Sequence, residues 1–262
     1  MCRCWTRLGD TAGASVTTPL LVDDHDDRVV LRLNRPEVRN AIDRATVDAL
    51  HNACDMLERR PRVALLIGSG TTFAAGADIA QLRDRRRDDA LAGINSGIFA
   101  RLHELPMPVI ALIDGYALGG GAELAYACDF RIGTPSTKIG NPEPGLGILA
   151  AAGATWRLRE LVGEPLSKEI LLAGRVLNAE EALAARLLNE VVTPGELEAA
   201  GHRLADKMCT QAPLAIRLTK SVFHAPPAAH PLIDDIAQAV LFETTDKFSR
   251  MTAFLERRKD KQ

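Results

Sequence analysis

Two glutamates stand in stretches of sequence that are unusual for a charged side chain. Glu123 follows three consecutive glycines and has apolar neighbours, whereas Glu143 lies between two prolines that would hold it on a rigid turn. An isolated glutamate is more often a solvated surface residue, and spacing alone does not overturn that interpretation. Two carboxyls in apolar surroundings are nevertheless suited to proton chemistry, because one can deliver a proton while the other activates water.

The glycines before Glu123 belong to the segment GYALGGGAEL (115–124), which follows the apolar run 109–113. A second glycine-bearing turn, residues 68–78, follows the apolar run 63–67. Both turns are expected to lead from a strand into a helix, where the first amide N–H groups have no partner within the helix. Two such donors that converge would form an oxyanion hole for a carbonyl oxygen. The alternative is that the glycines only allow a helix to pack closely against a strand.

The glycine turns do not fit the common nucleotide-binding motifs. A dinucleotide fingerprint requires a third glycine at the position of Phe73, and a phosphate-binding P-loop requires lysine at the position of Gly121. The net charge is −2, and aspartates dilute the one basic run, residues 83–87, which we interpret as a solvated helix face. We therefore expect neither a nucleic acid nor a membrane as a partner.

Apolar runs and helical patterns alternate over the first half of the chain. Strands are predicted at 29–33, 63–67, 109–113 and 130–132, and a helix is predicted after Asp43, with Val47, Leu50, Cys54 and Leu57 on its buried face. Strands separated by helices indicate parallel pairing and an α/β fold. After Pro144 helical patterns dominate, at 152–162, 166–173, 179–186, 195–210, 213–222 and 232–256. The C-terminal third is therefore predicted to be a helical region attached to the α/β core.

Cysteine content and the N-terminal sequence bear on the compartment. The chain has 5 cysteines among 262 residues, an odd and scattered set that indicates neither a disulfide framework nor a metal site. Residues 1–19 lack the apolar stretch of a signal peptide, and no segment approaches the roughly 18 apolar residues of a membrane span. These features predict a cytoplasmic protein with a flexible N-terminal extension over residues 1–19.

Three segments together resemble a known family. FAAGADI (73–79), GYALGGGAELAYACD (115–129) and NPEPGLGI (141–148) are similar, in order and spacing, to the signature segments of the enoyl-CoA hydratase/isomerase family, also called the crotonase superfamily. RPEVRNAI (35–42) resembles the early loop of that family, and MTAFLERRK (251–259) resembles its C-terminal end. The resemblance extends over about residues 20–260 and is specific because the segments occur in combination.

The resemblance implies a fold and an assembly. Residues 20–194 are expected to form the family's spiral core, an α/β superhelix of ββα repeats, and residues 195–262 the C-terminal helical region that drives trimer formation. Members of the family are commonly dimers of trimers. The expected partners are therefore an acyl-CoA thioester and further copies of this chain.

The resemblance also implies roles for four central positions. Ala77 and Gly120 match the two peptide N–H donors of the oxyanion hole, which hold the thioester carbonyl as it becomes enolate-like. Glu123 and Glu143 match the two catalytic glutamates of the hydratases: the first deprotonates water for attack at Cβ, and the second delivers a proton to Cα. Isomerase members often keep only the later glutamate, so the presence of both favours hydration.

Further residues are expected to bind the substrate or its coenzyme A moiety: Arg39, Ala41, Ala75, Gly76, Asp78, Ile79, Gly147 and Arg257. The two arginines among them are the expected phosphate partners. Coenzyme A is part of the substrate, and no separate cofactor or metal is predicted.

Two departures from the family pattern lie near Glu143. Ala150-Ala151 replaces a Pro-Gly pair, and Asn141 stands where glutamine or leucine is frequent. The turn behind Glu143, and with it the shape of the acyl pocket, is therefore expected to differ. The loop from Ile79 to about Asn95 lines that pocket in relatives and varies widely, so the acyl chain length does not follow from the sequence.

Three functional hypotheses follow. The first is a 2-enoyl-CoA hydratase; the second is another crotonase-type enzyme, such as an isomerase, a dehydratase or an acyl-CoA hydrolase. The third is a catalytically silent acyl-CoA binding protein that keeps the fold. The presence of both Glu123 and Glu143 argues against the third hypothesis.

Overall fold

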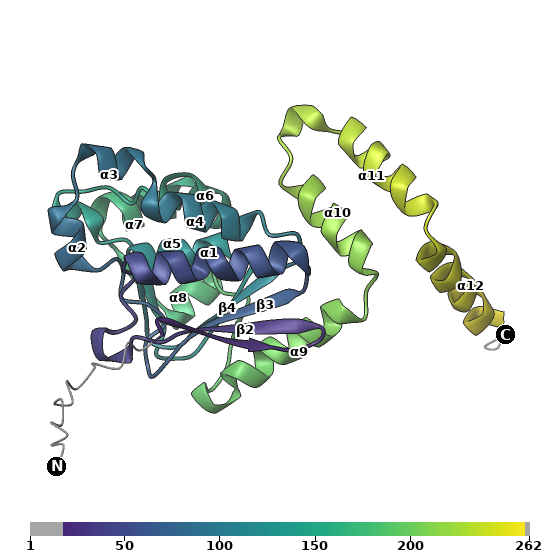
Figure 1. The fold of residues 1–262 in the computed structure, drawn as a ribbon, viewed down its shortest axis with the longest axis horizontal. Coiled ribbons are helices and arrows are strands. Elements are labelled where there is room, and N and C mark those ends of the chain that lie inside the picture. The colour runs from purple at the N-terminus through teal and green to yellow at the C-terminus, as the bar shows by residue number, and fades with distance from the viewer. Residues whose placement is uncertain (1–17, 260–262) are drawn as a thin grey trace, which may run out of the picture.

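The computed structural model describes residues 18–259, which form two β-sheets and surrounding helices (Figure 1). The larger sheet has six strands in the order β1-β2-β3-β4-β6-β9. Their bounds are Leu20–Asp24 (β1), Arg28–Leu33 (β2), Val63–Gly68 (β3), Val109–Ile113 (β4), Phe130–Gly133 (β6) and Glu190–Val191 (β9). Only β1 and β2 are antiparallel neighbours; the remaining pairs are parallel. The four strands predicted from apolar runs are thereby confirmed.

A smaller sheet of three strands lies beside the first, in the order β5-β7-β8. It consists of Tyr116–Leu118 (β5), Lys138–Gly140 (β7) and Val176–Asn178 (β8). Strands of three residues produce no recognisable alternation in the sequence, and none of these was predicted. They matter for function because β5 ends directly before the three glycines and β7 ends directly before Asn141.

The described part of the chain contains twelve α-helices. Their bounds are Arg44–Arg59 (α1), Ile79–Asp84 (α2), Arg87–Leu91 (α3), Ile94–His103 (α4), Gly120–Ala127 (α5), Ala154–Val162 (α6), Glu164–Ala173 (α7), Ala179–Ala184 (α8), Leu197–Cys209 (α9), Pro213–Phe223 (α10), Leu232–Phe242 (α11) and Thr245–Lys259 (α12). Within residues 18–259, no helix combines the length and apolar character needed to cross a bilayer.

The larger sheet is buried on both faces, which explains its continuous apolar strands. Along β3, Ala64 and Leu66 belong to the core on the side of α1 and α5, whereas Leu65 and Ile67 belong to the core on the side of α9. Helix α1 begins as predicted, because the Asp43 carboxylate accepts a hydrogen bond from the Thr46 amide at 2.8 Å.

Two sequence-based expectations about helices are wrong. The predicted helix 232–256 is two helices, because the Thr244 hydroxyl accepts a hydrogen bond from the Lys247 amide at 3.3 Å and caps a new helix. The segment from Ile79 to Asn95, expected as a loop, contains the short helices α2 and α3. The boundary between core and helical region at 194–195 stays a prediction, although α9 packs directly on the larger sheet.

A buried arginine pairs with carbonyl groups at the C-terminal end of α5. Arg131 is 3% exposed, and its guanidinium donates to the carbonyl oxygens of Cys128 at 2.7 Å, Ala125 at 3.3 Å and Leu187 at 2.7 Å. Asp129, the next residue after α5 and its cap, accepts a hydrogen bond from Lys220 on α10 at 2.7 Å. These contacts fix the far end of α5 and attach α10 to the core.

The first turn of α5 lies very close to residues 74–77. A Cβ atom placed on Gly121 would lie 2.1 Å from the carbonyl oxygen of Ala74, a distance that side chains do not adopt. The same stretch is tied to β5 by hydrogen bonds from the Ala74 amide to the Tyr116 carbonyl, at 3.0 Å, and from the Leu118 amide to the Ala74 carbonyl, at 3.1 Å. Close packing therefore requires glycine at position 121.

We expect Gly121→Ala to lower the free energy of unfolding by about 3 kcal/mol or more, because a backbone carbonyl must move to admit one methyl group. Gly97→Ala on α4 is the matched control, since a Cβ atom there would have no neighbour within 4 Å. The control should be stabilised by about 0.5–1 kcal/mol through helix propensity. Chemical denaturation measures both; equal stability of the two variants would contradict the packing role.

Candidate active site

Two backbone amides, those of Ala77 and Gly120, lie close together where residues 74–77 meet α5. A Cβ atom on Gly120 would lie 3.3 Å from the Ala77 nitrogen, so no side chain separates the two peptide groups. The Ile42 amide donates to the Gly76 carbonyl at 2.8 Å and the Asp78 amide to the Ile42 carbonyl at 3.0 Å, which holds the chain on both sides of Ala77. In the turns and loops of the described residues, neither the Ala77 amide nor the Gly120 amide donates a hydrogen bond to a backbone carbonyl. Gly120 is the first residue of α5, where an amide has no partner within the helix.

Each of the three consecutive glycines, 119–121, meets a different structural requirement. Gly119 has φ 52° and ψ −125°, a conformation open to glycine. Gly120 leaves the space between the two amides free, and Gly121 permits the close approach to Ala74. Close packing and access to the amides, which the sequence presented as alternatives, are thus assigned to neighbouring residues.

The Glu123 side chain is buried one turn into α5. It is 4% exposed, and its Oε1 accepts hydrogen bonds from the amides of Ala152, at 2.7 Å, and Ala154, at 3.1 Å. Burial raises the pKa of Glu123 to about 7, and the Glu143 charge adds to the rise, while the two amide donors oppose it. Such a carboxyl exchanges a proton readily near neutral pH.

The Glu143 carboxyl lies against the first of the three glycines. A Cβ atom on Gly119 would lie 3.1 Å from Oε1 of Glu143, which places this carboxyl next to the start of α5. Glu143 is 7% exposed and begins a short 3₁₀ helix, Glu143–Leu146, as expected for a rigid turn. Burial raises its pKa, and its Oε2 has no hydrogen-bond partner within the described residues. The structure thus gathers the four positions that the resemblance singled out.

Six of the residues expected to bind the substrate or coenzyme A lie in two joined segments: Arg39, Ala41, Ala75, Gly76, Asp78 and Ile79. The Ala75 amide donates to the Arg39 carbonyl at 3.0 Å. Arg35 joins the segments further, since its guanidinium donates to the Ala41 carbonyl at 2.6 Å and lies 3.6 Å from the Asp78 carboxylate.

The two remaining expected residues differ in position. Gly147 ends the 3₁₀ helix that begins at Glu143, with a left-handed φ of 73°. Arg257 lies on α12, which Figure 1 shows extending away from the sheets, and its guanidinium donates to the Ala253 carbonyl at 3.1 Å. The structure therefore does not bring Arg257 to the site formed by its own chain.

Several polar groups around the site were not predicted, because no motif in the sequence indicates them. The Asn95 Nδ2 atom would lie 3.8 Å from a Cβ on Gly120, and Arg85 donates to the other end of this amide at 2.9 Å. Both residues lie in the segment without a motif. The turn that supplies the Ala152 and Ala154 amides to Glu123 was indicated only as a departure from the family pattern.

The burial of Glu123 predicts a pH-dependent cost in stability. The Glu123 carboxyl has a pKa of about 7 in the folded chain and an ordinary value of 4.5, which applies to the unfolded chain. The folded chain therefore binds the proton more tightly, and the free energy of unfolding falls as the pH rises between these two values. Glu123→Gln removes this dependence. From pH 5 to pH 8, the unfolding free energy of the variant should gain about 1–3 kcal/mol relative to the wild type.

Thermal and urea unfolding at several pH values measure this difference, with exposed Glu180→Gln as the control. A difference between Glu123→Gln and the wild type that stays constant over pH would show that Glu123 ionises in the folded chain as it does in the unfolded one.

Comparison with known proteins places this geometry in a family. The enoyl-CoA hydratase/isomerase family model matches residues 27–262. The chain is 37% identical to the crotonyl-CoA hydratase of Syntrophomonas wolfei, with 92% of this chain and 96% of the relative covered. It is 35% identical to the short-chain-enoyl-CoA hydratase of Clostridium acetobutylicum, with 88% and 92% covered.

Solved structures of similar proteins share this fold over most of the chain. An enoyl-CoA hydratase from Bacillus anthracis has a TM-score of 0.86 and 31% identity, with 91% of this chain and 96% of that chain covered. DspI of Pseudomonas aeruginosa has a TM-score of 0.85 and 32% identity, with 95% and 98% covered. The expected crotonase-like fold is thereby confirmed, and the named relatives support enoyl-CoA hydration. The chain belongs to the enoyl-CoA hydratase/isomerase family.

Proposed function

We propose that this enzyme adds water across the 2,3 double bond of a 2-enoyl-CoA thioester by means of Glu123, Glu143 and the amides of Ala77 and Gly120. The observation that carries the proposal is the juxtaposition of two buried carboxyls with two neighbouring backbone amides. The product is a 3-hydroxyacyl-CoA. Because the relatives named above include crotonyl-CoA and short-chain-enoyl-CoA hydratases, we propose a short acyl chain for the substrate.

In this mechanism the two amides bind the thioester oxygen. Attack at Cβ moves electron density onto that oxygen, and donors held in place by the backbone stabilise the enolate without reorganisation. One such donor contributes roughly 2.7–4 kcal/mol in other enzymes. Asp78, Gly76 and Ala75 hold the chain around Ala77, and Arg39 is the proposed phosphate partner of coenzyme A.

The two carboxyls then divide the proton chemistry. Glu123 acts in its ionised form and takes a proton from water, since Oε1 is held by two amides and Oε2 remains for the water molecule. Glu143 acts in its protonated form, which burial favours, and its proton passes to Cα as the enolate electron pair forms the C–H bond. Transfer of the gained proton from Glu123 to Glu143, directly or through solvent, completes the cycle.

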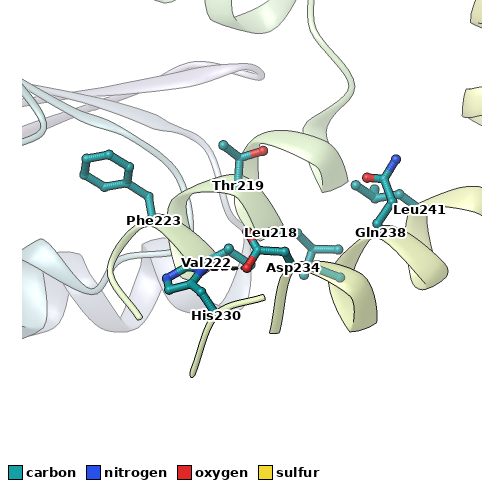
Figure 2. Close-up of a pocket in the computed structure, with 9 residues that line it drawn as sticks. Leu218, Thr219, Val222, Phe223, His230, Asp234, Gln238 and Leu241 are labelled. Atoms are coloured by element: carbon teal, nitrogen blue, oxygen red, sulfur yellow. Dashed lines mark hydrogen bonds and ion pairs between the residues drawn. The ribbon is translucent and has the colours of Figure 1, made fainter. Parts of the chain in front are cut away.

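The C-terminal helices support a proposal about assembly. Large apolar side chains recur at helical spacing on α10–α12, a pattern that ordinarily marks a buried helix face, yet they are exposed in the single chain. They are Phe223, Leu232, Ile236, Val240, Phe242, Phe248, Met251, Phe254 and Leu255. A cavity of about 460 Å³ opens between α10 and α11, lined by Leu218, Val222 and Leu241 among others (Figure 2). Apolar surface of this extent marks an interface, and we propose a trimer or a dimer of trimers.

Replacing either Glu123 or Glu143 by glutamine should lower kcat for crotonyl-CoA hydration by about 10²- to 10⁴-fold, because each variant loses one proton-transfer group. KM should change little, since the thioester is held by backbone amides. Loss of the absorbance of the conjugated thioester measures turnover, and exposed Glu180→Gln is the control. Near-normal turnover in either active-site variant would remove that glutamate from the mechanism.

Sedimentation equilibrium should give a mass of three or six times 28.3 kDa at micromolar concentration. Val240→Asp should shift the mass toward one chain, because it introduces a charge into the proposed interface. Val22→Asp is the matched control: the two valines are similarly exposed, 47% for Val22 on β1 and 50% for Val240 on α11. A wild-type mass of 28.3 kDa would contradict the proposed assembly.

A further inference from the structure

An asparagine connects the Glu143 carboxyl to a tyrosine behind it. Asn141 is 0% exposed and lies between β7 and the 3₁₀ helix that begins at Glu143. The Tyr126 hydroxyl, on α5, donates a hydrogen bond to Oδ1 of Asn141 at 3.1 Å. Nδ2 of Asn141 lies 3.4 Å from Oε1 of Glu143 and 3.5 Å from the carbonyl oxygen of Gly119.

These neighbours fix the orientation of the Asn141 amide. With Nδ2 toward Glu143, both amide hydrogens face oxygen acceptors and the amide oxygen faces a hydroxyl donor. The flipped amide would place its oxygen against the Gly119 carbonyl oxygen, which has no hydrogen to donate. Burial raises the pKa of the Tyr126 phenol, so the hydroxyl keeps the proton that it donates.

The fixed amide distinguishes the two oxygens of Glu143. Oε1 accepts from Asn141, whereas Oε2 is buried and has no hydrogen-bond partner in the described part of the chain. A protonated carboxyl has one O–H group, and placing it on Oε1 would set it against the hydrogens of the Asn141 amide. The proton therefore belongs on Oε2, which is free to direct it at a ligand.

We propose that Asn141 is a positioning residue, held by Tyr126, that keeps the transferable proton of Glu143 on Oε2. This inference rests on the proposed role of Glu143 as the acid in hydration. During the transfer the Oε2–H bond breaks, the C–H bond at Cα forms from the enolate electron pair, and Glu143 becomes a carboxylate. The Asn141 N–H group binds this carboxylate more strongly than the neutral acid, so it favours the transfer.

Asn141 also affects the acidity of Glu143. Its hydrogen bond lowers the pKa of the carboxyl and opposes the larger effect of burial, which raises it. Glu123, on α5, is the other ionisable carboxyl that interacts with Glu143, and Tyr126 stays neutral. Loss of the Asn141 amide should therefore leave Glu143 harder to ionise and should not change the contacts that hold Glu123.

Asn141→Leu and Tyr126→Phe test the proposal in the full-length enzyme with crotonyl-CoA. Asn141→Leu should lower kcat by about 10- to 100-fold with little change in KM, the effect of losing one hydrogen bond to a developing charge. In the pH profile of kcat/KM, the limb that reports Glu143 should move to higher pH by about one unit. Tyr126→Phe should act in the same direction with a smaller loss.

The double variant and a buried control separate positioning from packing. Because Tyr126 acts through Asn141, the double variant should be no slower than Asn141→Leu alone. Thr137→Val removes a hydroxyl that is likewise 0% exposed and lies next to the same strand, so it should lower thermal stability while leaving kcat and the pH profile unchanged. Additive losses, or an Asn141→Leu variant with the wild-type pH profile, would overturn the proposal.

The acidity of Glu143 can also be measured without turnover. The infrared carbonyl band of its protonated carboxyl, identified by its loss in Glu143→Gln, should persist to higher pH in Asn141→Leu than in the wild type. Absence of hydration by the wild-type enzyme would refute the proposed function alone, because the infrared titration still tests the link between Asn141 and Glu143. An unchanged titration midpoint would overturn the inference.

Discussion

The structure of this site depends on how closely the first turn of α5 approaches residues 74–77. Without a side chain at position 121, two segments from distant parts of the sequence come together at a distance that other residues would prevent, and the missing side chain at position 120 leaves the contact uncrowded. The same approach determines where the first turn of α5 points, and so places Glu123 and the carboxyl that lies against Gly119. The close approach of the Ala77 and Gly120 amides and the placement of the two carboxyls are consequently products of one packing contact.

Around that contact the protein buries two carboxyl groups, Glu123 and Glu143, without an ion pair to either of them among the described residues. Surface carboxylates of this chain pair with arginine, as Asp55 and Glu58 do with Arg101, and their pKa values fall. The Glu123 carboxyl instead accepts hydrogen bonds from two backbone amides, and the Glu143 carboxyl accepts one from the neutral Asn141 side chain. Neutral donors hold a carboxyl in place but only partly offset the rise in pKa that burial causes, so both groups can accept or lose a proton readily.

The sequence predicted features that depend on local patterns and missed those that depend on tertiary contacts. Apolar strand runs and the Asp43 cap are local and were predicted correctly, and the signature segments indicated the four central residues. The break between α11 and α12 was missed, because a capping threonine does not interrupt the apolar pattern. The contact between Tyr126 and Asn141 and the position of Asn95 beside Gly120 depend on residues far apart in the sequence, and no spacing rule indicates them.

The contacts of Arg131 have a consequence at the opposite end of α5. This helix has 8 residues, so its positive amide end and negative carbonyl end are close together and would largely cancel at a short distance. A buried guanidinium on the carbonyls of Ala125 and Cys128 screens the negative end. The amide end then exerts a one-sided electric field on the site. An arginine or lysine in contact with the glutamates would create the same field but would form ion pairs with them. Arg131, at the far end of the helix, strengthens the field without contacting either glutamate.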